Sequence, residues 1–297
     1  MVSVRFGLSL TTSRRAFKSN AGQNNHFVIT LLVGLDAVRS GTALLSEEFS
    51  TTWEPKDKHA SAARSREYVL KSSLTWIIDL IDVYRRSVTN TSSLITDVQK
   101  QQIERIDSRA LRLRELAKLL KINLGDPNLL MVLLAFAWRN RVVHSDAYTK
   151  VDAELKARLA EQAGDIAQLY NGLEINRTIA ACEESAAPSF KEVAAIIRAS
   201  HKLVEDIDSS ATSNIDYDSY VESLLCEHFA GRFKSDRQVF AKMWPGSKEK
   251  TAQRLSTLLL QKGMVLIEPG ENGTSDEYFD RLIGLKPSEV RRRFTSV

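Results

Sequence analysis

Six consecutive residues combine the side-chain types that can cleave a phosphodiester. The segment Arg139-Asn140-Arg141-Val142-Val143-His144 directly follows ten apolar residues, Leu129 to Trp138. Histidine exchanges a proton near neutral pH because its unperturbed pKa lies there. Arginine presents a planar guanidinium that contacts a phosphate at two points and stabilises developing negative charge. The pattern therefore predicts a phosphate-directed site at the end of an apolar helix.

Helix geometry limits how these side chains can meet. On a continuous helix Asn140 and His144 share a face, whereas Arg139 and His144 diverge by about 140°. Arg139 and His144 can converge on one phosphate only if the helix ends or bends between them, or if a second copy of the chain supplies one of them. A two-fold dimer would place two such segments across one shared cleft. Asn140 would bind the phosphate or hold Arg139, and Arg141 is either a second phosphate contact or a solvent-exposed charge.

A purely structural role for the same residues is also open. His144 can cap a helix C-terminus, where a cationic ring meets the helix dipole favourably. Arg139 and Arg141 can likewise donate to the last carbonyls of the helix. An arginine followed by a histidine at about this spacing is expected by chance, so the spacing alone proves nothing. The asparagine directly after Arg139 and the apolar helix before it favour the chemical interpretation.

Apolar residues at three- and four-residue spacing predict the helices that position the segment. Expected helices cover residues 26–45, 60–86, 97–120, 128–138, a stretch after Asp152 to about 185, 190–207, 217–230, 236–243 and 247–262. Pro127 suits a helical first turn, and Thr149 to Asp152 resembles a helix-opening cap. Short strands are expected within residues 2–10 and at Met264 to Ile267.

These elements predict an all-α chain in four parts. Residues 1–25 read as a loosely structured arm, residues 26–207 as a helical bundle, residues 208–216 as a linker rich in serine and threonine, and residues 217–297 as a smaller, mostly helical module. The linker composition is typical of a domain boundary. Three helices and a strand that ends in a glycine-containing turn make the C-terminal module resemble a winged helix.

Composition narrows the class of protein. The chain has 297 residues, 43% of them hydrophobic and 26% charged, which is typical of a folded globular protein. The net charge of +4 permits an anionic partner without requiring one. Cys182 and Cys226 have neither a disulfide nor a metal-ligand spacing, and the ten-residue apolar stretch covers only about 15 Å as a helix. We expect a cytoplasmic protein with no membrane segment, no metal and no cofactor.

An all-helical bundle with Arg-Asn-x-x-x-His at the end of an apolar helix resembles the HEPN superfamily (higher eukaryotes and prokaryotes nucleotide-binding). Many of its members are metal-independent ribonucleases of toxin, antiphage-defence and CRISPR-associated systems. The resemblance covers residues 26–207, and its specific part is the segment 139–144 alone. It implies RNA cleavage by the ribose 2′-hydroxyl, with Arg139 on the phosphate, His144 as general acid or base and Asn140 assisting. It also implies a homodimer with a composite site, and it leaves room for a regulatory protein partner.

Two features of the family are not matched clearly by this sequence: the acidic residue that orients the arginine and the tyrosine that follows the histidine. Family members often carry an acidic residue on an earlier helix that orients the arginine, and Asp79 and Asp82 are both candidates here. A toxin–antitoxin subset places a tyrosine two residues after the histidine. Asp146 stands at that position, with Tyr148 two residues later, so that form of regulation is not implied.

Two other functions stay open from the sequence. The bundle could be a non-catalytic module that binds RNA or a protein partner, because a fold does not secure an activity. The chain could instead be a DNA-binding regulator that acts through its C-terminal block. That alternative predicts salt-sensitive duplex binding by residues 214–297 alone, without any dependence on His144.

Overall fold

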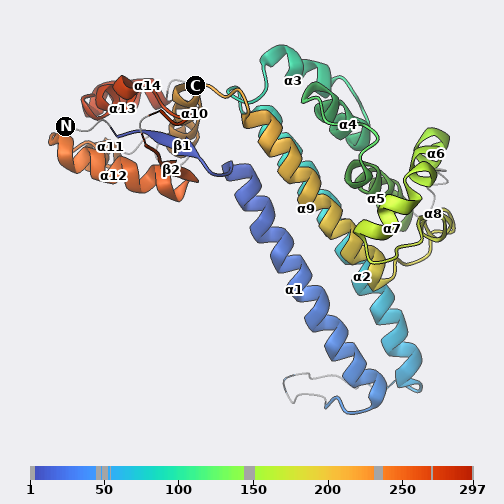
Figure 1. Ribbon diagram of the computed structural model, residues 1–297. Helices are drawn as coiled ribbons and strands as arrows, with labels where there is room; N and C mark the ends of the chain where they lie inside the picture. Colours follow the sequence, from blue (N-terminus) through green and yellow to red (C-terminus); the bar gives the residue numbers. More distant parts are fainter. Residues whose placement is uncertain are drawn as a thin grey trace. The chain divides into compact units, whose positions relative to one another are not determined.

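The computed structural model describes residues 4–44, 48, 53, 55–143, 151–230, 237–268 and 270–295. Within these residues the chain is all-α, as predicted, with one small two-stranded sheet (Figure 1). The elements in chain order are β1 (Phe6–Leu8), α1 (Thr12–Ser40), α2 (Lys58–Asn90), α3 (Asp97–Glu104), α4 (Arg109–Leu119), α5 (Pro127–Val143), α6 (Ala153–Glu161), α7 (Ala163–Leu169), α8 (Ile175–Glu183), α9 (Phe190–Thr212), α10 (Tyr217–Ala230), α11 (Arg237–Met243), α12 (Lys248–Gln261), β2 (Met264–Leu266), α13 (Asp276–Ile283) and α14 (Pro287–Thr295).

The chain divides into two compact units. Unit 1 consists of Met1–Arg15, Arg86–Gln102 and Asp208–Val297, and unit 2 consists of Ala16–Arg85 and Ile103–Ile207. The division after residue 207 coincides with the predicted end of the helical bundle. Unit 1 nevertheless also takes in the N-terminal residues and the segment around α3.

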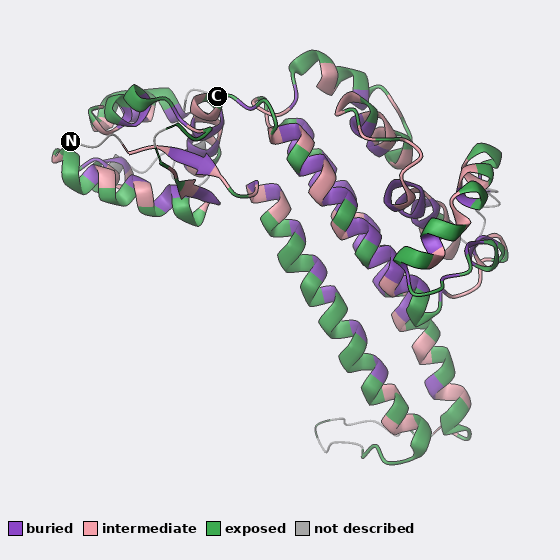
Figure 2. Ribbon diagram, in the orientation of Figure 1, coloured by how far each residue is buried: buried purple, intermediate pink, exposed green. Residues whose placement is uncertain are grey.

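Helix α5 is a core helix of unit 2. It begins at Pro127, where the Asp126 carboxylate accepts from the backbone N–H groups of Asn128 at 2.8 Å and Leu129 at 3.2 Å. Nearly all of its side chains from Asn128 to Trp138 are buried, and it contacts α4, α6 and α8 (Figure 2). The strongly apolar sequence therefore marks a core helix, as predicted.

The long helices of unit 2 are joined by hydrogen bonds to backbone carbonyls. Asn24 on α1 donates to the carbonyl of Ser73 on α2 at 3.3 Å, and Tyr84 on α2 donates to the carbonyl of Val204 on α9 at 3.2 Å. All of these polar groups are buried, so each bond removes a desolvation penalty as well as linking two helices.

Unit 1 has its own hydrophobic core. Strand β1 pairs antiparallel with β2, with Phe6 opposite Leu266 and Leu8 opposite Met264. The fully buried Phe6 ring packs against Phe279 at a centroid distance of 5.1 Å. Buried apolar side chains of α10 to α14 complete this core.

Several element boundaries differ from the sequence expectation. Strand β1 lies within the strand expected over residues 2–10, but residues 12–25 form the first half of α1 instead of a loose arm. The buried stripe of α1 already starts at Phe17 and Ala21. The expected helix over 97–120 is split into α3 and α4, with Ser108 capping the second. The stretch after Asp152 forms α6, α7 and α8, and the cap of α6 is the Asp152 side chain, which accepts from Leu155 N–H.

The linker expectation also needs adjustment. Helix α9 continues to Thr212, so only four residues separate it from α10. The hydroxyl of Thr212 donates to the carbonyl of Asp208 at 2.8 Å, which lets a threonine near the helix end bond within the helix instead of competing with it. Across the described ranges, no helix combines the length and the apolar character that a bilayer crossing requires.

Candidate functional site

The C-terminal turns of α5 are tied to the segment that follows α8. The indole N–H of the buried Trp138 donates to the carbonyl of Ala186 at 2.9 Å. Arg141, three residues later on the same face, donates to the carbonyl of Glu183 and to the hydroxyl of Ser185, the latter at 3.2 Å. These bonds satisfy carbonyls at the end of α8 and fix the rotation of α5 about its axis.

That rotation turns the neighbouring face of α5 toward α2. Arg139 on this face lies beside Asp79 of α2, with its Nη2 3.4 Å from the carboxylate Oδ1. Its Nη1 lies 3.4 Å from the side-chain oxygen of Asn140. Its Nε is buried and has no acceptor among the described residues. The guanidinium is held only weakly, because its two hydrogen bonds are long and its third donor has no acceptor.

Asp82, the other acidic candidate, has a different partner. Its Oδ1 accepts from Nε and Nη2 of Arg85, one turn later on α2, at 3.0 Å and 2.8 Å. Both side chains are almost fully buried, with exposed fractions of 6% and 3%. The two-point geometry makes this a structural ion pair inside unit 2. Of the two carboxylates, Asp79 is therefore the one that contacts Arg139.

A second arginine joins the same carboxylate. Arg109, the first residue of α4, places Nη1 3.3 Å from Oδ1 of Asp79 and Nε 3.8 Å from Oδ2 of Asp82. Its side chain is 55% exposed, whereas that of Arg139 is 17% exposed. Asp79 thus lies between two guanidinium groups, one at the surface and one partly enclosed.

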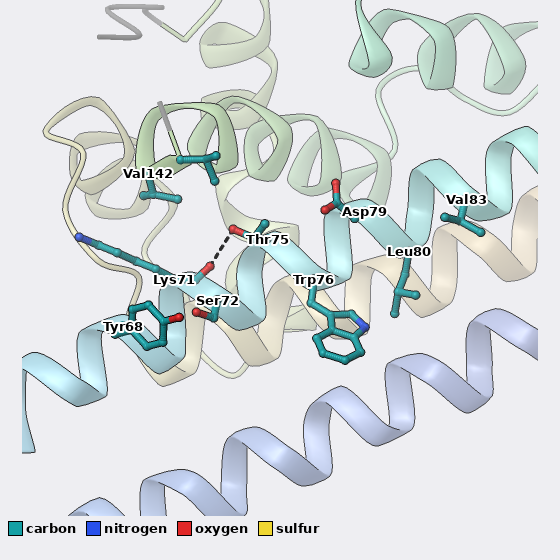
Figure 3. Close-up of a pocket in the computed structure, with 10 residues that line it drawn as sticks. Tyr68, Lys71, Ser72, Thr75, Trp76, Asp79, Leu80, Val83 and Val142 are labelled. Carbon is teal, nitrogen blue, oxygen red and sulfur yellow. Dashed lines mark hydrogen bonds between the residues drawn. The ribbon is translucent and has the colours of Figure 1, made fainter. Parts of the chain in front are cut away.

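A cavity of about 520 Å³ adjoins Asp79. Its walls come from one face of α2 and from the end of α5, and they are mostly apolar (Figure 3). The cavity is lined by Tyr68, Lys71, Ser72, Thr75, Trp76, Asp79, Leu80, Val83, Val142 and Val143. Its volume falls in the range of small-molecule sites.

Two aromatic side chains give this cavity its exposed surface. Trp76 is 46% exposed, and its ring meets Phe27 of α1 edge-on at 6.5 Å. Tyr68, two turns earlier on α2, is 73% exposed. Proteins that bind single-stranded nucleic acids stack unpaired bases on exposed aromatic rings that lie beside cationic groups.

The structure brings some of the sequence-derived site residues together. Arg139, Asn140 and Asp79 lie in one cluster, with Asn140 exposed to solvent. Arg141 points to the end of α8, and Asp82 is occupied by Arg85. His144 lies outside the described residues, as do Asp146, Tyr148 and the expected cap residue Thr149, so the approach of His144 to Arg139 stays a prediction.

Sequence reasoning missed Arg109, Trp76 and Tyr68. Arg109 is 30 residues from Asp79 along the chain, and only the packing of α4 brings it there. Trp76 and Tyr68 have a signal in hindsight, because a spacing of eight residues places two aromatic rings on one helix face. In the described ranges, no group of three or more His, Cys, Asp or Glu side chains is arranged to hold a metal ion.

Comparison with known proteins identifies no relative of this chain. The chain matches no protein-family model, and no curated protein or solved structure shows significant similarity to it.

Proposed function

We propose that unit 2 is a metal-independent endoribonuclease of HEPN type. The observation that carries the proposal is the contact of Arg139 with Asp79, because it supplies the carboxylate that the family resemblance expects beside its arginine. Asp79 lines the cavity and contacts the Arg139 guanidinium, and a phosphate can replace the long contacts that Arg139 now makes. Arg109 gives the same edge a second positive charge.

The family resemblance implies the reaction class. The ribose 2′-hydroxyl attacks the adjacent phosphorus and loses its proton, the P–O5′ bond breaks, and the 5′ oxygen takes up a proton. The products are a 2′,3′-cyclic phosphate and a 5′-hydroxyl. His144 exchanges these protons, and Arg139 stabilises the charge that develops on the non-bridging oxygens. Asn140, whose side chain is already 3.4 Å from Arg139, assists in holding the guanidinium.

The substrate is single-stranded RNA in this proposal. The cavity beside Asp79 has a volume of about 520 Å³, and Trp76 offers an unpaired base an exposed ring. Bases held in a duplex cannot leave their stack without an energetic cost, whereas unpaired bases in loops and ends stack on aromatic side chains readily. Trp76→Ala should therefore raise KM for a loop substrate more than it lowers kcat.

The active form is a homodimer in this proposal. Helix α1 exposes Phe27 and Leu31 on one side, where the Phe27 ring meets Trp76. On the other side it exposes Ile29 and Val33, one turn apart, and Val33 is 65% exposed. Apolar side chains gathered on one helix of a folded protein mark an interaction surface, and a second copy is the occupant that the family resemblance supplies. The biological setting, toxin activity or antiphage defence, follows from the resemblance alone.

Dimerisation can be tested separately from cleavage. Val33→Glu should shift the sedimentation coefficient from dimer to monomer and abolish cleavage, because a charge at the interface loses its solvation. Val98→Glu is the matched control, since Val98 is 76% exposed on α3. A monomeric wild-type chain that cleaves RNA at full rate would exclude a composite site.

The proposal is tested by incubating a mixed pool of structured and single-stranded RNA with the full chain in EDTA. We expect cleavage by the native protein, and loss of cleavage in His144→Ala and Arg139→Ala. His59→Ala and Arg105→Ala are matched controls, because both side chains are exposed and lie outside the site. If the histidine variant cuts as fast as the native chain, the ribonuclease assignment fails. If no protein in the series cuts, a non-catalytic interaction module becomes the favoured function.

A further inference from the structure

Helices α11 and α12 of unit 1 follow each other with the short connection of a helix–turn–helix motif. Only residues 244–247 separate them, and Gly246 in this turn has a positive φ of 87°. The turn is fixed at both ends, because the buried Trp244 donates to the carbonyl of Leu282 at 2.9 Å and Ser247 caps α12. A short turn that contains glycine is typical of this motif, whose second helix reads DNA.

One face of α12 is buried in the core of unit 1. Thr251, Leu255, Leu258 and Leu259 lie on this face and have little or no exposure. The three leucines belong to the core of unit 1, in which α12 contacts β2, α13 and α11. The orientation of α12 about its own axis is therefore determined by packing, which is what a helix needs in order to present fixed side chains to a partner.

The opposite face of α12 is exposed and polar. Lys250, Gln253, Arg254, Thr257 and Gln261 recur at three- and four-residue steps, so they form one stripe along the helix. Part of this stripe borders a shallow hollow of about 510 Å³ that also contacts Met243 and His228. Arginine pairs with guanine at two points and glutamine pairs with adenine in the same way, so the stripe carries side chains that distinguish bases.

The charge around the stripe favours a polyanion. Lys242, Lys248, Lys250 and Arg254 are exposed on or next to α12. Neither Lys250 nor Arg254 forms an ion pair with any carboxylate that the structure describes. Glu249 is the single acidic residue of α12, and it accepts a hydrogen bond from Ser247 at 2.7 Å in the first turn, four residues before Gln253. Unpaired cations beside base-reading side chains complement the phosphates that flank a DNA groove.

We propose that unit 1 binds double-stranded DNA with α12 in the major groove. The 14 residues of α12 make a helix of about 21 Å, which spans a B-form major groove about 12 Å wide. Arg254 and Gln253 read base edges, and Lys250 contacts a phosphate. The A-form groove of duplex RNA is too deep and narrow for a helix to enter. This proposal does not depend on the ribonuclease function of unit 2.

The test uses the full chain and a labelled random-sequence DNA duplex of about 20 base pairs, followed by fluorescence anisotropy. We expect binding that weakens between about 50 and about 200 mM salt. The double variant Lys250→Ala with Arg254→Ala should lose affinity by about tenfold or more and lower the salt slope by about 1, because Lys250 is the phosphate contact of the pair. The matched double variant Arg281→Ala with Lys286→Ala removes two exposed charges of the same unit and should bind normally.

Three further measurements complete the test. Circular dichroism should show equal helicity for both double variants, because all four side chains are exposed. Selection from a random duplex pool should enrich a sequence motif that Gln253→Ala relaxes. His144→Ala should bind DNA as the native chain does, which separates this proposal from the ribonuclease. Equal binding of duplex RNA, an equal loss in the matched variant, or no DNA binding at all would overturn the proposal.

Discussion

Replacing Asp82 by asparagine should cost far more stability than replacing Asp79, although both residues lie on α2 within one turn. Asp82 and Arg85 are 6% and 3% exposed and are joined at 3.0 Å and 2.8 Å. Removing one charge from a buried pair leaves the other charge uncompensated, which typically costs about 3–5 kcal/mol. Asp79 is 47% exposed, and pairs at that exposure contribute about 1 kcal/mol or less.

These magnitudes give a clear thermal signature. For a unit of this size a loss of 1 kcal/mol lowers Tm by about 2–4 °C, so Asp82→Asn should lower it by about 6–20 °C. Asp79→Asn should lower Tm by about 4 °C at most. Asp36→Asn is the matched control, since Asp36 forms an exposed pair with Arg39 at 3.3 Å in the same unit. Differential scanning calorimetry of the full chains measures all three.

Cleavage of RNA should show the opposite order. Asp79→Asn removes the group that orients Arg139, so kcat/KM should fall about 10- to 100-fold while the protein stays folded. Asp82→Asn should retain activity at temperatures well below its lowered Tm. If Asp79→Asn destabilises the chain as much as Asp82→Asn does, the burial argument is refuted. If Asp79→Asn folds and cleaves normally, Asp79 does not position Arg139.

Three other changes have defined outcomes. Arg141→Ala should lower the free energy of unfolding by about 1–3 kcal/mol in urea titration, because the variant loses the hydrogen bonds to Glu183 and Ser185. Its RNA cleavage should stay within a few-fold of wild type. Burial raises the pKa of Cys182 to about 12 and also raises that of Cys226, so a disulfide reagent should modify Cys226 slowly and Cys182 only after denaturation. Burial and the nearby charge of Lys262 lower the pKa of His228, although Glu227 opposes this shift. The unfolded chain therefore binds a proton at His228 more readily than the folded chain does, so the free energy of unfolding should fall as the pH drops below about 6.5. His228→Gln should flatten this pH dependence.

Local signals predicted the helices whose ends carry strong markers. Helix α10 was expected over 217–230 and covers Tyr217–Ala230, because the linker before it and its regular apolar spacing define both ends. Helix α1 starts 14 residues earlier than expected. Its first turns carry mostly polar residues, and only the packing of Phe17 and Ala21 shows that they are helical. In such segments tertiary contacts determine the secondary structure, and helix propensity and composition do not predict it.

The candidate site was predictable in kind but not in detail. The sequence singled out Arg139 and named both carboxylates of α2, since each could face an approaching arginine. Choosing Asp79 over Asp82 required the rotation of α5, which Trp138 and Arg141 determine through contacts more than 40 residues away in sequence. Arg109 could not be assigned to the site, because nothing local to it distinguishes it from other surface arginines.

Unit 1 is built from residues near both ends of the chain, because the N-terminal strand β1 is part of its core. Phe6 is fully buried, its N–H donates to Thr274 Oγ1 at 3.0 Å, and β1 supplies the only partner that β2 has in the described sheet. Residues 214–297 alone would leave these groups exposed, so we expect that fragment not to unfold cooperatively. In the full chain Phe6→Ala should cost about 3–5 kcal/mol, whereas Phe27→Ala, at an exposed position, should cost much less. A fragment 214–297 with the Tm of the intact unit would contradict this dependence, and DNA binding must therefore be measured on the complete chain.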